Sequence, residues 1–169
     1  MGRNGNYFAY QRYDIEPDIM TLAQALGGGV AIGAMMAKPE LAAVLTPGKH
    51  ASTFGGNCLA CAAGIAVIEA IEEDGLLQNA KELGEYAMGK LRQLKDKHSI
   101  IESVRGIGMM IGVQLTGPGK AIVDKCLEKG LRINCTHETV LRFMPPMIAT
   151  KEQIDKAIEI LDGVLSGAE

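Results

Sequence analysis

The chain has 169 residues, of which 47% are hydrophobic and 22% are charged, and 17 basic against 20 acidic residues leave a formal net charge of −3. This composition is typical of a globular protein with one ordinary domain, or with a small domain and part of another. With no basic run, no signal-peptide-like leader and no apolar stretch long enough for a membrane span, we expect a cytoplasmic protein with no nucleic-acid or membrane partner.

The first part of the chain predicts two short strands on either side of a glycine run. Residues 18–22 and 31–37 are short apolar stretches, and three glycines at 27–29 separate them. The glycines do not have the Gly-x-Gly-x-x-Gly spacing of a nucleotide fingerprint, so we expect them to serve a tight connection. Residues 39–45 then predict a short helix with proline in its first turn.

Two helices are expected in the middle of the chain. Asn57 is a good N-cap for a long helix, and the Asp74-Gly75 pair breaks or kinks that helix. Apolar residues recur at steps of three or four, which predicts one apolar face on each helix. They are Ile65, Ile68 and Ile71 before the break, and Leu83, Ala87, Leu91 and Leu94 after it.

An alternating stretch follows these helices. Apolar residues occupy every second position from 107 to 115, a period of two that predicts one strand. Residues 116–119 read as a turn. Residues 121–129 predict a helix, and Gly130 is a good C-terminal stop for it.

The last elements predict an α+β arrangement. Residues 131–135 and 140–143 are expected to form two short strands. Thr150 and the glutamine three residues later form a capping box that opens a last amphipathic helix over 154–165. From about residue 97 onward we therefore expect paired strands with helices on one face.

The cysteines and histidines do not indicate a metal site. Cys58 and Cys61 form a Cys-x-x-Cys, which suits a redox pair or half of a zinc site, but no second pair completes it. We expect both cysteines to be small apolar residues in the first turn of a helix. His50, His98 and His137 have no acidic or cysteine partner at ligand spacing and are expected on the surface or in loops.

Six short motifs stand in a fixed order along the chain. They are Gly-Arg-Asn-Gly at 2–5 with the residues to 9, Glu-Pro-Asp at 16–18 leading into the 17–29 stretch, 32–36, Ser-Thr at 52–53 with 57–62, Arg-Gly-Ile-Gly at 105–108, and Leu-Arg-Phe-Met-Pro-Pro at 141–146. An ordered set is far more specific than any single motif. Together they resemble the class III pyridoxal-phosphate (PLP) aminotransferases, in the acetylornithine and ornithine aminotransferase group.

The resemblance implies an α/β (α+β) fold, the C-terminal part of a fold-type I PLP-dependent transferase. Residues 1–56 would be a remnant of the PLP-binding large domain, 57–96 the linking helices, and 97–169 the small C-terminal α+β domain. A full family member is more than twice as long, and its N-terminal part would carry the phosphate loop, the stacked aromatic ring and the aspartate facing the pyridine nitrogen. Because the family's large-domain sheet is mostly parallel, this remnant cannot bury both its faces alone, and we expect a homo-oligomer, most simply a dimer.

Position 24 is where the resemblance places the lysine that holds PLP as a Schiff base, and here it is Gln24. An amide nitrogen, whose lone pair is delocalised into the carbonyl, cannot attack an aldehyde as an amine does. Two interpretations stay open: a dead catalytic site, or a polar loop residue in a chain that no longer binds PLP. Lys38 or Lys49 would need a large loop movement to replace the missing amine.

The resemblance also implies three binding residues. Thr53 matches the threonine that reaches the PLP phosphate of the neighbouring subunit, and Ser52 lies beside the substrate, although an ordinary N-cap region would select the same residue types. Arg142 matches the arginine that binds the substrate carboxylate, the alternative being an exposed strand arginine. Arg3 and Arg105, each next to a glycine, are weaker candidates with a possible structural role.

The family reaction implied by the resemblance transfers an amino group from an ω-amino acid such as N-acetylornithine to 2-oxoglutarate, with PLP as cofactor. Because of Gln24 we predict no transamination by this chain. Two alternatives have no catalytic role for the chain by itself. It would be either a non-catalytic oligomerising or partner-binding module that uses exposed apolar faces, or the C-terminal half of a split enzyme completed by a separate N-terminal chain.

Overall fold

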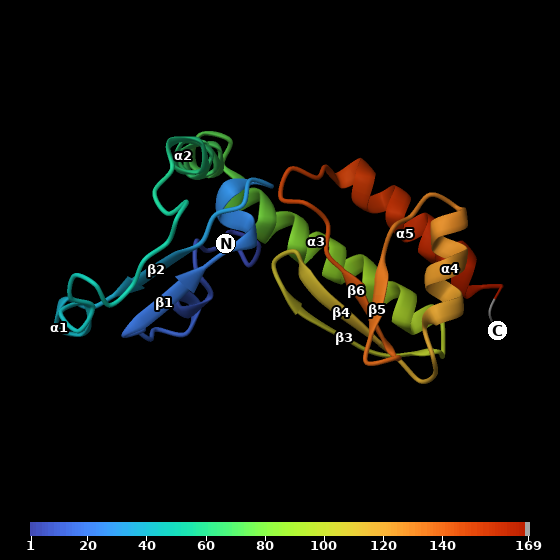
Figure 1. Cartoon of the computed structure of the whole chain (residues 1–169). Coiled ribbons are helices and arrows are strands. Elements are labelled where there is room, and N and C mark those ends of the chain that lie inside the picture. The colour runs from blue at the N-terminus through green and yellow to red at the C-terminus, as the bar shows by residue number, and fades with distance from the viewer. Residues whose placement is uncertain (168–169) are drawn as a thin grey trace. The chain divides into compact units, whose positions relative to one another are not determined.

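The computed structural model describes residues 1–167, and of Gln24 only the backbone. The chain divides into two compact units (Figure 1). Unit 1 comprises Met1 and Phe8–Gly75, and unit 2 comprises Gly2–Tyr7 and Leu76–Glu169. The two helices expected in the middle of the chain therefore belong to different units, and the division into three parts remains a prediction.

Unit 2 is built on a four-stranded antiparallel sheet with the strand order β3-β4-β6-β5. Antiparallel neighbours with one covered face favour strands in which apolar and polar residues alternate, as they do here. The strands are β3 (Ile101–Ile107), β4 (Met110–Leu115), β5 (Asn134–Thr136) and β6 (Val140–Phe143).

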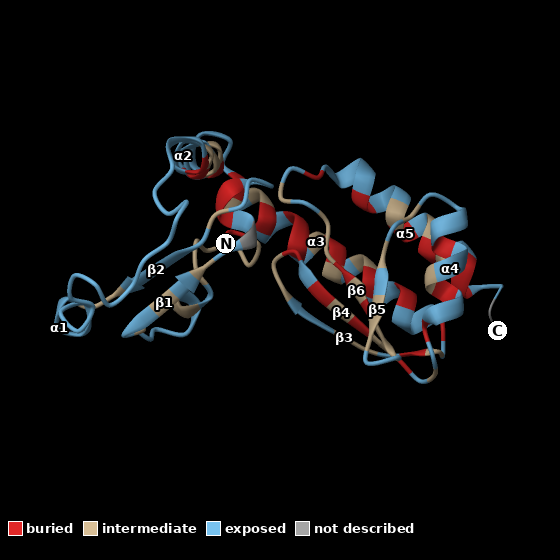
Figure 2. Cartoon of the chain, in the orientation of Figure 1, coloured by how far each residue is buried: buried red, intermediate tan, exposed pale blue. Residues whose placement is uncertain are grey.

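Three helices cover one face of this sheet: α3 (Leu76–Lys97), α4 (Lys120–Glu128) and α5 (Lys151–Leu165). The strand residues that point toward them form the core of unit 2, drawn red in Figure 2. On β4 these are Ile111, Val113 and Leu115, and on β6 Leu141 and Phe143, none of them more than 4% exposed. Burying side chains of this size contributes about 1.5–3 kcal/mol each, so this face sets the register of the sheet.

The prediction of one strand from 107 to 115 is wrong, because the chain turns at Gly108 and Met109. Ile107 pairs with Met110, so β3 and β4 form a hairpin with a two-residue loop. Gly108 has a φ of +53° and Met109 has a negative φ, the pattern of a type II′ turn. The alternation of buried residues begins only at Met109. Ile107 fits the same spacing in the sequence, but it pairs with Met110 and lies on the opposite face of the sheet.

The β3–β4 turn is held by close backbone contacts from two sides. A Cβ on Gly84 of α3 would lie 2.3 Å from the carbonyl of Gly108, so the helix passes directly against the turn. From the N-terminal segment, the carbonyl of Arg3 accepts a hydrogen bond from the amide of Met109 at 2.9 Å. Arg3 is thereby fixed in unit 2, close to the strands.

The helices at the end of the chain begin and end largely as the sequence predicts. Thr150 accepts a hydrogen bond from the amide of Gln153, and Gln153 accepts one from the amide of Thr150, which confirms the capping box. The strand expected over 131–135 begins only at Asn134. The reason is a Schellman motif, in which Gly130 adopts a φ of +85° and the amide of Leu131 donates to the carbonyl of Cys126.

His98 lies in the loop directly after α3, one of the two places expected from the sequence, but it is buried and not on the surface. It is 2% exposed, and its Nε2 lies 2.6 Å from Oδ1 of Asp162 on α5. Lys97 donates to the same carboxylate at 2.7 Å. Chiefly through the hydrogen bond from Lys97, and then through His98, these contacts lower the pKa of Asp162. Because Asp162 is 64 residues away in sequence, the spacing of residues around His98 could not predict this contact.

Unit 1 contains two short antiparallel strands, β1 (Ile19–Leu22) and β2 (Ala34–Ala37), with the 3-10 helices η1 (Ala9–Arg12) and η2 (Gln24–Gly27) and the helices α1 (Pro39–Ala42) and α2 (Cys58–Glu73). The expected strands and helices are present, although β2 and α1 are shorter than predicted. Asn57 caps α2 by accepting a hydrogen bond from the amide of Ala60 at 2.9 Å, and Gly75 interrupts the helix with a φ of +62°.

Unit 1 buries few of its apolar side chains. In α2 only Ile71 of the three predicted apolar residues is buried, while Ile65 and Ile68 are exposed, and Phe54 and Leu59 are 80% and 75% exposed (pale blue in Figure 2). A two-stranded sheet without a covering layer is marginally stable at best in water. None of the helices found within residues 1–167 has both the length and the apolar character to cross a membrane.

Candidate functional site

The four residues predicted to form a site are divided between the two units. Arg142 lies on β6 of unit 2 and is half-buried. Gln24, Ser52 and Thr53 lie in unit 1, Gln24 at the start of η2 and the other two in the loop before α2. We therefore describe each unit's part of the site separately.

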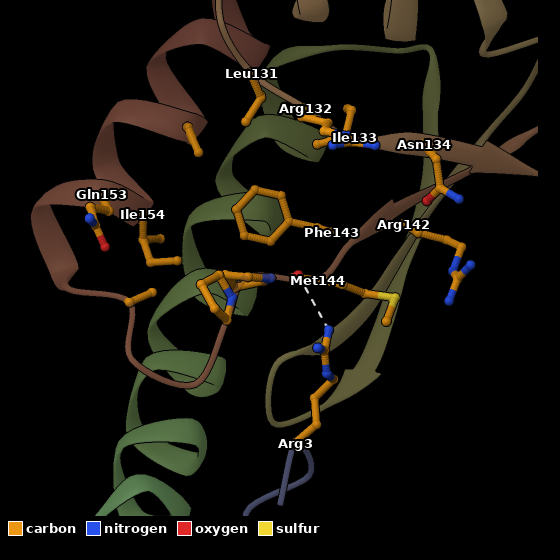
Figure 3. A pocket seen from close by; sticks show the side chains of 14 residues that line it. Arg3, Leu131, Arg132, Ile133, Asn134, Arg142, Phe143, Met144, Gln153 and Ile154 are labelled. Atoms are coloured by element: carbon orange, nitrogen blue, oxygen red, sulfur yellow. Dashed lines mark hydrogen bonds between the residues drawn. The ribbon is translucent and has the colours of Figure 1, made fainter. Parts of the chain in front are cut away.

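A hollow of about 680 Å³ lies in unit 2, where β6 ends and the chain leads into β5 (Figure 3). Three arginines line it, and none of the lining residues is acidic. The lining residues are Arg3, Leu131, Arg132, Ile133, Asn134, Arg142, Phe143, Met144, Pro145, Pro146, Ala149, Gln153, Ile154 and Ala157.

The three guanidinium groups of the hollow have little to pair with in the described part of the chain. Arg3 donates one hydrogen bond from Nη1 to the carbonyl of Met144 at 3.3 Å, the dashed line in Figure 3. Within residues 1–167, neither Arg132 nor Arg142 forms an ion pair. Guanidinium groups pair with carboxylates through two parallel N–H bonds, so an acid-free arginine cluster is suited to an organic anion.

The hollow also has an apolar wall. Phe143 and Ile154 are 4% and 1% exposed and line one side of it. Figure 3 shows Phe143 pointing toward Ile154 on α5, while Arg142 points the opposite way, as expected for neighbouring residues of a strand. The apolar wall and the guanidinium of Arg142 therefore lie on opposite sides of β6.

Ser52 and Thr53 are exposed in the loop that leads to the N-terminus of α2. Two turns shape this loop: the amide of Gly55 donates to the carbonyl of Ser52, and the amide of Asn57 donates to the carbonyl of Phe54, both at 3.3 Å. The N-terminus of a helix carries partial positive charge, and the two hydroxyls lie just before it in the chain. The geometry is compatible with an anion contact, and the roles of Ser52 and Thr53 remain predictions.

Residue 24 begins η2, a single turn packed against α2. The two elements are in van der Waals contact, since a Cβ on Gly64 of α2 would lie 3.7 Å from the carbonyl oxygen of Leu26. The side chain of Gln24 lies outside the described part of the structure. Its chemistry follows from the sequence: whatever its conformation, position 24 presents an amide and no amine.

Unit 1 has two lysines, Lys38 and Lys49. Lys38 Nζ lies 2.8 Å from Oδ1 of Asp18, and this hydrogen bond raises the pKa of Lys38 and keeps its amine protonated. A protonated amine has no lone pair for attack on an aldehyde. Lys49, the other lysine of this unit, lies in an exposed loop. The donor set of unit 1 therefore does not fit a covalently held PLP, and we assign no chemical step to that cofactor.

The described residues contain no group of three or more histidine, cysteine or acidic side chains arranged to hold a metal ion. Cys58 and Cys61 lie in the first turn of α2, as expected, and both are exposed free cysteines. Their pairing in sequence therefore coincides with an ordinary position at the start of a helix.

Sequence reasoning missed Arg132 as a member of the arginine cluster and ranked Arg3 low. No motif surrounds Arg132, but one signal was present: if the two last predicted strands pair as a hairpin, Arg132 comes close to the end of the strand that carries Arg142. Arg3 reaches the hollow through the contact of its backbone with the β3–β4 turn. That contact joins segments 106 residues apart and cannot be read from local pattern.

Comparison with known proteins gives a consistent result. The family model described as class-III aminotransferase matches residues 1–165. The acetylornithine aminotransferase of Methanocaldococcus jannaschii is 53% identical over 168 residues, and that of Aquifex aeolicus is 49% identical over 166 residues. Each alignment covers 98% of this chain and 42% of the relative, so the chain spans about two fifths of the length of these relatives.

Solved structures give the same picture. The crystal structure of acetylornithine aminotransferase from Elizabethkingia anophelis matches with a TM-score of 0.92 and 31% identity, over 98% of this chain and 45% of the other. Ornithine δ-aminotransferase of Plasmodium falciparum matches with a TM-score of 0.92 and 31% identity, over 98% of this chain and 44% of the other. The α/β fold of this chain is thus similar to part of a PLP-dependent aminotransferase of fold type I.

Proposed function

The chain belongs to the class-III aminotransferases, and from this premise we propose that it provides the C-terminal, carboxylate-binding part of an acetylornithine-type aminotransferase and does not itself catalyse transamination. The substrates of such an aminotransferase are amino acids and 2-oxo acids, and PLP is the cofactor that the family uses. Relatives named acetylornithine aminotransferase at 49–53% identity support this substrate class.

The observation that carries the proposal is Arg142 in an arginine-lined hollow without a carboxylate. All substrates of such a reaction carry a carboxylate, and a guanidinium both holds and orients it. Because Arg142 has no ion-pair partner in residues 1–167, a bound carboxylate would not have to displace an internal one. Thr53 and Ser52 are proposed to contact the cofactor phosphate and the substrate, respectively.

The absence of transamination rests on position 24. PLP supplies a reactive aldehyde when an aminotransferase holds it, and the enzyme's lysine both anchors that aldehyde and moves the substrate proton. Gln24 can do neither, and Lys38 is held protonated by Asp18. We therefore expect this chain to bind carboxylates and to leave their amino groups in place.

An amino-transfer assay tests the proposal. The purified chain is supplied with PLP, N-acetylornithine and 2-oxoglutarate, and glutamate formation is measured; we expect none above the rate with PLP alone. Gln24→Lys is the informative variant, because it restores an amine at position 24, and Gln93→Lys on the exposed side of α3 is the matched control. Borohydride trapping should give a PLP adduct at residue 24 in the first variant and no adduct at residue 93 in the second. Ordinary turnover by the unmodified chain contradicts the proposal.

A second candidate function is favoured by the apolar surface of unit 1. Large side chains there are well exposed, with Val44 at 70%, Phe54 at 80% and Leu59 at 75%. Exposed aromatic side chains such as Phe54 are enriched in protein interfaces. We propose that unit 1 associates with a second copy of the chain. Light scattering over a range of concentrations checks this: a stable dimer supports it, and a monomer at all concentrations contradicts it.

A further inference from the structure

Two exposed thiols stand at the start of α2. Cys58 and Cys61 are both exposed to solvent, and both are free cysteines. Cysteine is among the residue types most often buried, because its side chain behaves as a small apolar group. In this turn Ala60 is the residue that packs inward, and Leu59 between the cysteines is itself 75% exposed. Packing therefore does not account for either thiol.

The geometry of α2 places the two cysteines at the spacing of a disulfide. Cys58 is the first residue of α2, and Cys61 follows three positions later. A rise of about 1.5 Å per residue on a cylinder of about 2.3 Å radius puts Cα atoms at this spacing about 5 Å apart, on the same side of the helix. Disulfides usually join Cα atoms that are about 4.4–6.8 Å apart. The backbone thus permits a bond between the two sulfurs.

A small movement at the end of the helix would close this bond. Cβ atoms three positions apart on a helix are separated by about 5–6 Å, whereas a disulfide needs about 3.5–4.5 Å. Cys61 is held in the helix, because its amide donates to the carbonyl of Asn57 at 3.0 Å. Cys58 is the first helical residue, and the amide of such a residue has no acceptor within its helix. Cys58 is therefore the residue that can move.

The electrostatic setting favours exchange at this pair over the chain's other two cysteines. A thiolate is the reactive form of cysteine, and the partial positive charge at a helix N-terminus is favourable for a negative group. Residues 58–61 include no acidic side chain that would repel it. Cys126 is buried, and burial raises the pKa of its thiol. Cys135 is half-buried, and its Sγ donates to the carbonyl of Glu138 at 3.1 Å.

We propose that Cys58 and Cys61 form a reversible dithiol–disulfide pair, which a low-molecular-weight disulfide such as oxidised glutathione converts to the disulfide. One protein thiolate attacks a sulfur of the small disulfide, whose S–S bond breaks and releases one small thiolate. The other protein thiolate then attacks the protein sulfur of the mixed disulfide and releases the second small thiolate. The two protein thiols give up two protons to solvent and two electrons to the small disulfide.

The pair is built into the cap of α2. The side chain of Asn57 accepts a hydrogen bond from the amide of Ala60 at 2.9 Å and donates to the carbonyl of Phe54 at 2.8 Å. Because Cys58 follows Asn57 directly, moving Cys58 to close the disulfide strains this cap and the loop before it. That loop carries the two hydroxyl residues that we propose to contact cofactor and substrate. This coupling rests on the proposed function, whereas formation of the disulfide does not.

Oxidation of the full chain with glutathione tests the proposal. The native protein is incubated with oxidised glutathione, quenched by acid and alkylation, and analysed by intact mass and peptide mapping. We expect the unmodified chain to lose two hydrogen atoms, with the bond at Cys58 and Cys61, and to recover both thiols with dithiothreitol. Cys58→Ser and Cys61→Ser should each carry one glutathione on the remaining exposed cysteine. Cys135→Ser is the matched control and should behave as the unmodified chain.

Several results would overturn the pair. They are glutathione on both cysteines of the same chain, a covalent dimer in place of the internal bond, and no reaction of the native chain where the unfolded chain reacts. The amide resonance of Ala60 reports the coupling to the cap, and it should shift on oxidation and return on reduction. An unchanged resonance in the oxidised chain contradicts the coupling. None of these measurements depends on carboxylate or PLP binding, so failure of the proposed function is distinguishable from failure of the pair.

Discussion

At the scale of single residues, position 24 decides what chemistry is available to the chain. We propose that Gln24 leaves an amide where the family has its nucleophilic amine, and that neither lysine of unit 1 compensates for it. Lys38 is held as an ammonium by Asp18 at 2.8 Å. Its pKa is raised first by that hydrogen bond and then by the charge of the carboxylate, so its free-amine form is rarer than for an ordinary lysine.

The Asp18–Lys38 pair gives a direct test of this argument. Asp18→Asn removes the charge that raises the pKa of Lys38, so at mildly alkaline pH a larger fraction of the amine is unprotonated. We expect more borohydride-trapped PLP on Lys38 in the variant than in the unmodified chain, measured by peptide mass mapping. Labelling of Lys49, which has no such partner in residues 1–167, is the internal control. Equal labelling of Lys38 in both proteins would show that the ion pair does not limit its reactivity.

Single residues also show what sequence could predict. Arg142 is identified by the Leu-Arg-x-x-Pro-Pro motif, and the resemblance needs no structure to be seen. Arg132 belongs to no motif, and only the folded chain brings it into the lining of the same hollow as Arg142. The burial of His98 was not predicted for a similar reason, because its carboxylate partner lies on a helix that is distant in sequence.

At the scale of elements, local patterns predicted helices better than strands. The caps of α2 and α5 and the stop after α4 depend on residues within a few positions, and all three are confirmed. The β3–β4 hairpin was missed because Ile107, which precedes the two-residue turn, happens to fit the alternation of buried residues that follows it. The sequence pattern therefore looked like one uninterrupted strand. What fixes that turn is Gly84 on α3, a contact between elements that periodicity does not contain.

Two glycines of α3 provide a matched pair for testing that contact. Gly84→Ala forces a Cβ to within 2.3 Å of the carbonyl of Gly108, whereas Gly89→Ala meets no atom within 4 Å. Denaturant unfolding should show that the first variant loses about 1–3 kcal/mol or fails to fold. The second should gain about 0.5–1 kcal/mol from helix propensity. Similar effects at the two positions would contradict the packing of α3 against the turn.

The contact between α3 and α5 predicts a pH dependence. The pKa of Asp162 is lowered in the folded state, so this carboxylate contributes stability above its unfolded pKa and loses it as pH falls through the lower folded value. Asp162→Asn should therefore be destabilising at about pH 7, and its difference from the unmodified chain should shrink below about pH 4.

Unfolding in denaturant at the two pH values measures the effect of Asp162→Asn. Asp96→Asn, also near the C-terminal end of α3 but exposed and without an ion pair in residues 1–167, should change stability little at either pH. A constant difference between Asp162→Asn and the unmodified chain across this range would mean that the carboxylate's charge does not stabilise the helix pair.

At the scale of the whole molecule, the two units differ in how much they bury. Unit 2 has a continuous apolar core between its sheet and helices, while unit 1 leaves much of its apolar surface exposed. The chain spans about two fifths of its relatives. Family resemblance was readable from ordered motifs over nearly the whole chain, and with it the prediction that residues 1–56 cannot bury both faces of their sheet alone. Which side chains stay exposed was not readable, because that depends on how the elements of unit 1 pack.

Hydrogen exchange should report this difference between the units. We expect slow exchange in β4 and β6, which lie inside the sheet of unit 2, and fast exchange in β1 and β2 at low protein concentration. If unit 1 binds a second copy of the chain, its amides should gain protection as concentration rises, while those of unit 2 stay the same. Equal protection of both units at low concentration would contradict a partner-dependent unit 1.

The central claim is that this aminotransferase-family chain has lost covalent attachment of PLP, and a PLP titration of the unmodified protein tests it most directly. The imine absorbance band is followed to saturation, and the product is reduced with borohydride and weighed as the intact chain. We predict no saturable band and no stoichiometric adduct. One PLP per chain on a single lysine would contradict the account, because it would mean that another amine has taken over the role of position 24.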